Sequence, residues 1–383
     1  MNIYPWQESL WQQLLGEARG LPHALLLTGD SGLGKFAFAQ ALAARLLCEQ
    51  AVAATTIPQA CGRCSACTWF AAGSHPDFRL VRPKSEEDAQ ASGGAAEEVA
   101  EGMSGGTSES VAKGGKGSKT GKSGKSDTKP AARLSQNIRI DQIRGLTDFV
   151  YTGSHRQGNR VILLEPAESM TTEAANSLLK MLEEPPPSVC FLMVSHAWRK
   201  LLPTIRSRCR TVALACPESE LALPWLRSEG VAEAGSLLRL AGGAPLLARD
   251  WGSQGYLEWY RKVIAGLTEA ATDPVAMAGQ WGVLLKSAQD SGLPQLVAAI
   301  QKWVQDLVQL KLAGSVRYHV DWQIKLQAVA ERAATPALLK YQTELLQIQR
   351  MARHPLNPQL FLEDMAARYI RAVAPVSAVS ASR

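Results

Sequence analysis

The segment His23-Ala-Leu-Leu-Leu-Thr28, followed by Gly29-Asp-Ser-Gly-Leu-Gly-Lys35, decides the fold class of this chain of 383 residues. The first run is short and apolar, as a buried strand is, and the glycines after it predict a turn. The Ala- and Leu-rich residues from Phe36 to Leu47 predict a helix. A strand, a turn and a helix in this order are typical of the opening of an α/β domain.

The turn also fits the phosphate-binding pattern Gly-x4-Gly-Lys, in the strand-to-helix setting that this P-loop pattern requires. Backbone N–H groups of the loop, which contains Gly29, Gly32 and Gly34, would surround phosphate oxygens, and Lys35 would reach the outer phosphates. The next residue should be Ser or Thr, which ligates magnesium, but it is Phe36. Binding of ATP or ADP without hydrolysis, and a glycine turn that holds no nucleotide, both stay open.

A second motif of P-loop ATPases is also altered. The apolar run Val161–Leu164 is followed by Glu165 and Pro166, where such an enzyme carries an Asp for magnesium and then a Glu that activates water. Proline cannot act as a general base. Glu168 is a poor substitute, because three further positions along the chain do not place its carboxylate at the same point. The two defects favour an ATPase fold without competent hydrolysis.

Strands and helices continue to alternate beyond this motif. Cys190–Ser195 is another short apolar run, and helices are expected over Glu173–Glu183 and Lys200–Ser207. The alternation implies a parallel sheet that is covered by helices on both faces. Pro185, Pro186 and Pro187 should end the earlier helix, because proline has no N–H and its ring disfavours a further turn.

The cysteines indicate a metal site rather than disulfides. Cys61-Gly-Arg-Cys64-Ser-Ala-Cys67 places three thiols at Cys-x2-Cys spacing, and Cys48 at the end of the preceding helix is the candidate fourth ligand. Four cysteinates form the closed tetrahedral site of structural zinc, Zn²⁺. No signal peptide or long apolar run is present, so we expect a cytoplasmic protein with reduced thiols and no membrane partner. Reduced thiols without metal are the alternative. The other cysteines are predicted to be core or surface residues: Cys190, Cys209 and Cys216.

Three domains and one insert are predicted from the patterns along the chain. Residues 1–213 form the α/β domain with the cysteine module at 48–67, residues 214–255 a small helical module, and residues 256–383 an amphipathic helical domain. The insert at 85–132 is rich in Gly, Ser, Lys and Glu, and we expect it to be flexible. Residues 84–133 carry eight basic and eight acidic side chains, so the net charge of +6 lies on the folded domains. Such a surface is compatible with work beside nucleic acid.

Seven motifs follow one another along the chain. They are Trp6-Gln7, Pro22-His23-Ala24, the four-cysteine insertion, Ile140-Asp-Gln-Ile-Arg144, Asn176-Ser-Leu-Leu-Lys-Met-Leu-Glu-Glu-Pro-Pro186, Leu202-Pro-Thr-Ile-Arg-Ser-Arg-Cys209 and His354-Pro-Leu-Asn-Pro-Gln-Leu360. In this combination the chain resembles the bacterial clamp-loader family of AAA+ proteins, which includes the gamma/tau and delta-prime subunits of DNA polymerase III. The resemblance implies a RecA-like AAA+ domain that bears zinc, a small helical lid at 214–255 and a helical collar at 256–383.

Departures from the family pattern indicate the branch. The family's motor subunit keeps a P-loop Ser or Thr, an Asp-Glu pair and a lid arginine; this chain has Phe36, Glu165-Pro166 and, at the arginine position, Leu246. The Ser207-Arg208-Cys209 motif is whole. The combination resembles the delta-prime branch, which does not hydrolyse ATP but completes a neighbour's site. It implies that Arg208 is an arginine finger acting in trans. The alternative is that Arg208 belongs to a solvated basic cluster.

The resemblance also implies the partners. They are gamma/tau and delta subunits in a hetero-pentameric ring within the DNA polymerase III holoenzyme, with the sliding clamp and primer-template DNA reached through the complex during replication. The isolated chain is expected to have no catalytic activity. Two other hypotheses stay open: an ATP-hydrolysing gamma/tau-like motor subunit that tolerates Phe36, and a zinc-containing DNA-binding protein outside the replisome.

Overall fold

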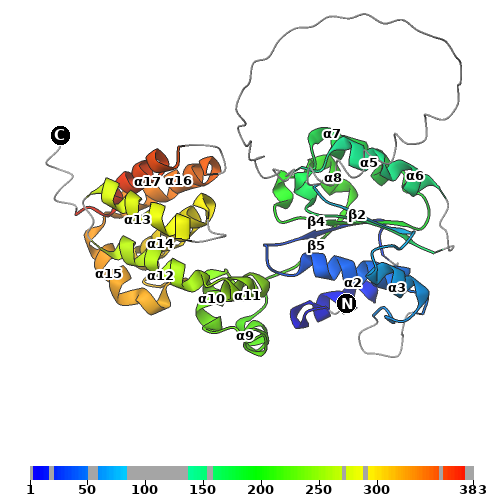
Figure 1. Cartoon of the computed structure of the whole chain (residues 1–383), viewed down its shortest axis with the longest axis horizontal. Coiled ribbons are helices and arrows are strands. Elements are labelled where there is room, and N and C mark those ends of the chain that lie inside the picture. Colours follow the sequence, from blue (N-terminus) through cyan, green and yellow to red (C-terminus); the bar gives the residue numbers. More distant parts are fainter. Residues whose placement is uncertain are drawn as a thin grey trace, which may run out of the picture. The chain divides into compact units, whose positions relative to one another are not determined.

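The computed structural model describes residues 3–16, 21–50, 59–83, 137–152, 158–269, 273–287, 292–352 and 357–375. They belong to two compact units (Figure 1): Met1–Gly29 with Lys35–Leu214, and Asp30–Gly34 with Ala215–Arg383. The insert predicted at 85–132 lies outside the described residues. The predicted domain boundaries, including the one at residue 255, stay predictions.

A five-stranded parallel sheet forms the centre of the first unit, in the order β2-β3-β4-β1-β5. Its strands are β1 (Ala24–Thr28), β2 (Phe78–Val81), β3 (Arg160–Leu164), β4 (Val189–Val194) and β5 (Arg210–Ala213). Every residue of the inner strands β1, β3 and β4 is buried, whereas the edge strands are partly exposed. Strands that are covered on both faces carry near-continuous apolar sequences, as these do apart from Arg160 and Thr28.

Helices cover both faces of the sheet (Figure 1). Leu25 and Leu27 of β1 pack on one face, with α1 (Glu8–Leu15), α2 (Lys35–Leu47) and α3 (Ser65–Ala71). Leu26 packs on the other face, with α5 (Ile140–Arg144), α6 (Leu146–Tyr151), α7 (Thr172–Glu183) and α8 (Pro203–Arg208). Short 3-10 turns complete the unit: η1 (Pro5–Gln7), η2 (Ala167–Ser169) and η3 (Trp198–Lys200). The α/β fold class predicted from the sequence is confirmed.

Two helix boundaries show how local chemistry sets the elements. The α7 helix begins after Thr171, whose side chain accepts a hydrogen bond from Ala174 N–H, and it ends before the three prolines, as predicted. The expected helix Lys200–Ser207 begins later than predicted, because Trp198–Lys200 is a separate 3-10 turn and Pro203 starts α8. Arg208 is therefore the last residue of α8 rather than the first residue beyond a helix.

The second unit is built from helices, as the periodicity of the C-terminal part predicts. Its first three helices enclose a small apolar cluster: α9 (Ser219–Ser228), α10 (Ala234–Leu240) and α11 (Pro245–Ser253). The others share a larger core: α12 (Tyr256–Thr268), α13 (Pro274–Ser287), α14 (Leu293–Ala313), η4 (Val320–Trp322), α15 (Gln323–Arg332), α16 (Thr335–Met351) and α17 (Pro358–Val373). Among the residues that the structure describes, no helix is long and apolar enough to cross a membrane.

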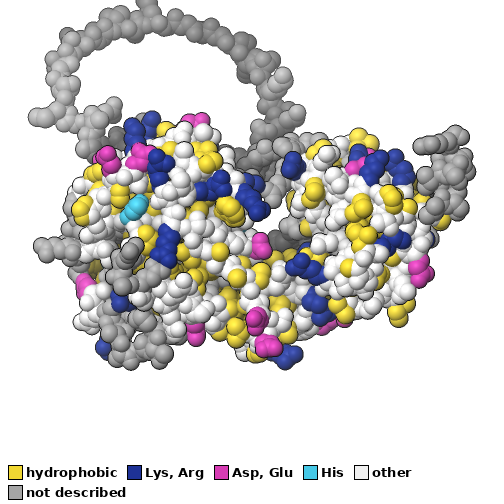
Figure 2. All heavy atoms as spheres, turned by 180° about the vertical axis from the view of Figure 1, so that it is seen from behind, with side chains coloured by type: hydrophobic (Ala, Val, Ile, Leu, Met, Phe, Trp, Pro, Cys, Tyr) yellow, Lys and Arg dark blue, Asp and Glu magenta, His cyan; other side chains and the backbone are white. Residues whose placement is uncertain are grey.

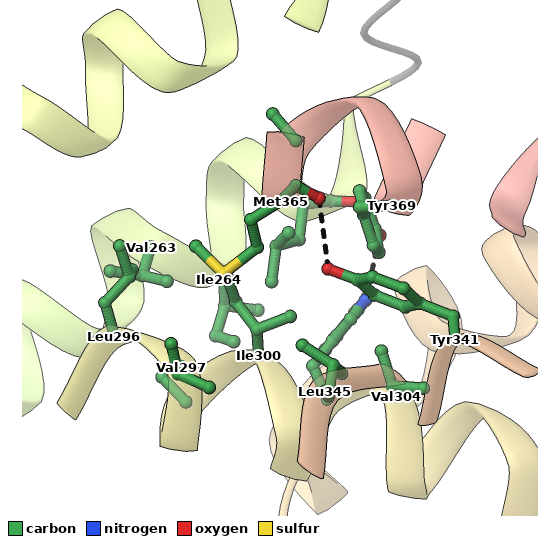
Figure 3. Packing of buried hydrophobic residues seen from close by; sticks show 14 of the residues in the cluster. Val263, Ile264, Leu296, Val297, Ile300, Val304, Tyr341, Leu345, Met365 and Tyr369 are labelled. Atoms are coloured by element: carbon green, nitrogen blue, oxygen red, sulfur yellow. Dashed lines mark hydrogen bonds between the residues drawn. The ribbon is translucent and has the colours of Figure 1, made fainter. Parts of the chain in front are cut away.

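The larger core combines apolar packing with paired polar groups (Figure 3). Ile300 of α14 lies beside Ile264 of α12 and Met365 of α17, all three almost fully buried. The Tyr341 hydroxyl donates to the Met365 carbonyl at 3.2 Å, and the Tyr369 hydroxyl donates to the carbonyl of residue 267 at 2.6 Å. Burial of these hydroxyls therefore leaves neither without a partner.

A buried carboxylate organises the chain after α14. Asp306 is fully buried, and its oxygens accept hydrogen bonds from the backbone N–H groups of Arg317, Tyr318 and His319 at 2.8 to 3.1 Å. His319 Nδ1 lies 2.8 Å from Asp306 Oδ2, and His319 Nε2 lies 2.8 Å from the Tyr260 hydroxyl. Burial by itself would raise the pKa of Asp306, but the hydrogen bonds from His319 and from the backbone outweigh it and lower that pKa.

We expect Asp306→Asn to lower the free energy of unfolding by about 3 kcal/mol at pH 7, because it removes the charge that accepts hydrogen bonds from three backbone N–H groups and contacts a buried histidine. A carboxyl whose pKa is lowered by folding stabilises the protein above its unfolded pKa, and this stabilisation is lost as the pH falls through the folded pKa. The difference between the two chains should therefore shrink below about pH 4. Urea unfolding of the full chain measures it. Asp364→Asn, at an exposed residue of α17, is the control, and equal stability of the Asp306→Asn and unmodified chains would contradict the prediction.

Candidate functional site

The P-loop lies between β1 and α2, where the sequence predicts it. Gly29, Gly32 and Gly34 have φ angles of 138°, 82° and 82°, which side chains rarely adopt, so the loop requires glycine at these positions. Lys35 is the first residue of α2, is only 2% exposed, and donates from Nζ to the Gly29 carbonyl at 2.8 Å. The predicted phosphate-loop residues are therefore together, with the lysine directed at the loop's own backbone.

The tip of the loop, Asp30–Gly34, belongs to the second compact unit. The Leu246 N–H, in the first turn of α11, donates to the Gly32 carbonyl at 3.0 Å. A Cβ atom on Gly32 would lie 2.6 Å from the Leu247 Cβ, so only glycine fits there. Leu246 occupies the position at which the family's motor subunit was expected to carry an arginine, and its side chain offers no donor to a phosphate.

Three side chains meet at the ends of β2 and β3. Arg82 follows β2 and Glu165 follows β3, and the pairing of Val81 with Leu164 makes them neighbours. Arg82 Nε donates to Glu165 Oε2 at 2.9 Å, Nη2 donates to the same oxygen, and the guanidinium carbon lies 4.0 Å from the centroid of the Phe36 ring. The sequence identified Phe36 and Glu165 as altered motif residues but gave no signal for Arg82, which lies in no recognised motif.

A histidine after β4 faces the same charges. The His196 N–H donates to Glu168 Oε1 at 3.0 Å, so Glu168 anchors the backbone at the end of β4. Burial lowers the pKa of His196, and the positive charge of Lys35 lowers it further, while Glu168 and Glu165 act in the opposite direction. These surroundings therefore favour the neutral form of His196 more than free solution does. The sequence had dismissed Glu168 as a substitute base and had not singled out His196.

The four cysteines predicted as ligands form one cluster. Their sulfur atoms all lie within 4.8 Å of one another, and Cys48 is 3.9 Å from Cys64, as Cys61 is from Cys67. Backbone N–H groups of residues 61, 64 and 67 point at the sulfurs of Cys48, Cys61 and Cys64 at 3.3 to 3.4 Å. Such N–H groups stabilise thiolates, so the cluster could hold a metal ion.

Protonation of the cysteines follows their surroundings. Backbone N–H groups of Arg63 and Cys64 lower the pKa of Cys61 to about 6, whereas burial raises the pKa of Cys67 to about 12. A bound cation would deprotonate both. Cys190 and Cys209 are buried outside the cluster, and burial raises the pKa of each thiol to about 12, so they are inert core residues, while Cys216 is exposed.

Arg208 ends α8, which packs on the face of the sheet opposite to α2, the helix that follows the P-loop. Its guanidinium pairs with Glu183 Oε1 at 2.5 Å and donates to the Thr204 carbonyl at 3.0 Å, and about a third of its side chain is exposed. Arg206 packs its guanidinium over the Trp198 ring instead. The α8 helix and the α2 helix thus lie on opposite faces of the sheet. Figure 2 shows Lys and Arg side chains on both units.

Comparisons with known proteins place these features in a family. A family described as "DNA polymerase III, delta subunit" matches residues 6–218. DNA polymerase III subunit delta′ of Pseudomonas aeruginosa is 32% identical over 376 residues, covering 96% of this chain and 97% of that protein. Subunit delta′ of Yersinia pestis is 30% identical over 90% of this chain and 88% of that protein. Among solved structures, a DNA polymerase III gamma subunit-related protein of Thermotoga maritima aligns over 62% of this chain and 81% of its own, at 20% identity and a TM-score of 0.33.

Proposed function

Because this chain belongs to the family of DNA polymerase III delta-prime subunits, we propose that it is a clamp-loader subunit that hydrolyses no ATP itself and completes the ATP site of a neighbouring subunit through Arg208. The observation that carries the proposal is the match to a delta′ subunit over 96% of the chain and 97% of the relative. A match of this extent covers the helical second unit as well as the sheet domain.

The altered P-loop site supports the absence of hydrolysis. Phe36 has no oxygen for magnesium, Pro166 stands where the water-activating carboxylate is required, and Leu246 replaces the lid arginine. The motor alternative is favoured by one observation: the glycines and Lys35 keep the backbone of a phosphate loop. ATP turnover by the isolated chain distinguishes the two functions.

Arg208 supports the role in trans. The helix that it ends, α8, packs on the sheet face away from α2, which supports a role outside the chain's own nucleotide site. In the isolated chain Glu183 neutralises it at the surface, and a phosphate of a neighbouring subunit would replace that carboxylate. The partners on this proposal are gamma/tau and delta subunits in a ring of five, with the sliding clamp and primer-template DNA bound by the whole complex.

The cysteine cluster is proposed to hold zinc. A tetrahedron with Zn–S distances of about 2.3 Å has edges of about 3.8 Å, close to the two sulfur–sulfur distances of 3.9 Å. Four thiolates leave no position for water, so the ion would be structural. It would join the end of α2 to α3, since Cys48 follows α2 while Cys64 caps α3 and Cys67 lies within it.

We expect one zinc per chain in protein that is purified without added metal, measured by elemental analysis. Cys61→Ser should lower the zinc content well below one and lower the unfolding temperature, because metal binding contributes folding free energy to this lobe. Cys216→Ser, at the exposed cysteine outside the cluster, should retain the metal. A zinc content near zero, with four thiols of the cluster freely reactive in the native protein, would rule the site out.

The isolated chain should hydrolyse ATP no faster than the buffer background, because the site lacks both a magnesium-ligating hydroxyl and a water-activating carboxylate. Phosphate release under saturating ATP and magnesium measures this. Lys35→Ala is the matched control, since it removes the lysine of the loop. Steady turnover that Lys35→Ala abolishes would assign the chain to the motor alternative.

In a complex reconstituted with its cognate subunits, Arg208→Ala should leave assembly intact, lower total ATPase by the share of one site, and slow clamp loading by about tenfold or more. Arg208→Lys should rescue poorly, because a point charge cannot reproduce the planar fork of guanidinium. Arg210→Ala, which removes the same charge two residues away, is the control. Unchanged clamp loading by an Arg208→Ala complex of normal yield would leave Arg208 as a surface residue without a role in trans.

A further inference from the structure

Arg82 touches both residues that replace the protein ligands of a P-loop magnesium ion. In P-loop ATPases that ion is held by the hydroxyl after the lysine and by the carboxylate after the next motif's strand. In this chain these two positions are Phe36 and Glu165. The Arg82 guanidinium lies 4.0 Å from the Phe36 ring centroid, and its Nε lies 2.9 Å from Glu165 Oε2. The residues present therefore do not fit a divalent metal.

We propose that the Arg82 guanidinium takes the place and the charge of the magnesium ion, so that this P-loop site excludes divalent cations. The proposal concerns the chain's own P-loop. It stands whether or not Arg208 acts in trans on a neighbour.

The chemistry of the cluster is consistent with an internal cation. A guanidinium over an aromatic face is attracted by the ring's negative electrostatic potential, which a serine or threonine at position 36 would not provide. Glu165 supplies the opposite charge and accepts from two nitrogens of the same guanidinium. A magnesium ion at this point would meet the positive charge of Arg82 at close range, and the two cations would repel each other.

The backbone around Arg82 holds it in this position. The Glu165 N–H donates to the Val81 carbonyl at 3.0 Å, which fixes the two strand ends side by side. Gln142 of α5 donates from Nε2 to the Arg82 carbonyl at 2.6 Å. Hydrogen bonds from the sheet and from α5 therefore fix the backbone from which the Arg82 side chain extends.

The test measures whether magnesium adds to the effect of ATP on the full chain. For the unmodified chain, we expect ATP to raise the unfolding temperature no more in magnesium than in EDTA. A shift of zero in both buffers also agrees with the proposal. Lys35→Ala shows whether any shift originates at the P-loop. A larger shift by ATP with magnesium than by ATP with EDTA in the unmodified chain, absent in Lys35→Ala, would overturn the proposal.

A comparison of three chains then separates the roles of Phe36 and Arg82. Mn²⁺ serves as a paramagnetic substitute for magnesium, and electron paramagnetic resonance counts the Mn²⁺ ions bound per chain in the presence of ATP. The unmodified chain and Phe36→Thr, which restores the hydroxyl but keeps the guanidinium, should bind no Mn²⁺ at this site. The double variant Phe36→Thr with Arg82→Gln should bind one, and ATP with magnesium should then raise its unfolding temperature by several degrees.

Two results would contradict the proposal. Binding of Mn²⁺ by Phe36→Thr alone would show that the missing hydroxyl was the whole obstacle, and failure of a folded double variant to bind it would show that Arg82 does not stand in the metal's place. Circular dichroism reports folding. If the double variant does not fold, the Phe36→Thr chain, which keeps the Arg82–Glu165 pair, decides by itself.

Discussion

The parallel hydrogen bonding of β1, β3 and β4 is the constraint on which the first unit depends. These strands are buried at every residue, so their backbone groups must be paired with one another, and the pairing fixes their register. The pleat of the strands sends alternate side chains into two separate cores, and their parallel direction brings their carboxyl ends to one edge. The P-loop, Glu165 and His196 all follow strand ends at this edge. The candidate site is thus a consequence of the sheet.

The α2 helix joins the two chemical features of this unit. It begins with Lys35, which bonds the P-loop backbone, and Cys48 follows its last residue. Through the sulfur of Cys48, which accepts from the Cys61 N–H, the end of the helix is tied to the cysteine cluster. The phosphate loop and the cluster therefore hold opposite ends of one buried helix.

Sequence alone predicted the features that depend on neighbouring residues. The P-loop, the end of α7 before its prolines and the set of four cysteines all follow from spacing over a few positions, and the order of strands and helices gave the α/β class. Arg82 could not be found in this way, because its partner Glu165 lies 83 positions away and the two meet only through the β2–β3 register. The buried Asp306 with His319 was missed for a related reason: single polar residues in amphipathic segments carry no pattern. The start of α8 was misplaced by three residues because Leu201 and Leu202 suit a helix as well as a turn.

Phe36 and Glu165 both contact Arg82, so the residues at the two altered motif positions are coupled through one side chain. A substitution that returned a hydroxyl to position 36 would leave Arg82 in place. Loss of Arg82 alone would remove the ion-pair partner of Glu165. A substitution at any one of the three positions therefore alters the surroundings of the other two. On the proposal that Arg82 occupies the place of magnesium, the cluster would act as an evolutionary ratchet, because restoring a metal site would require more than one substitution.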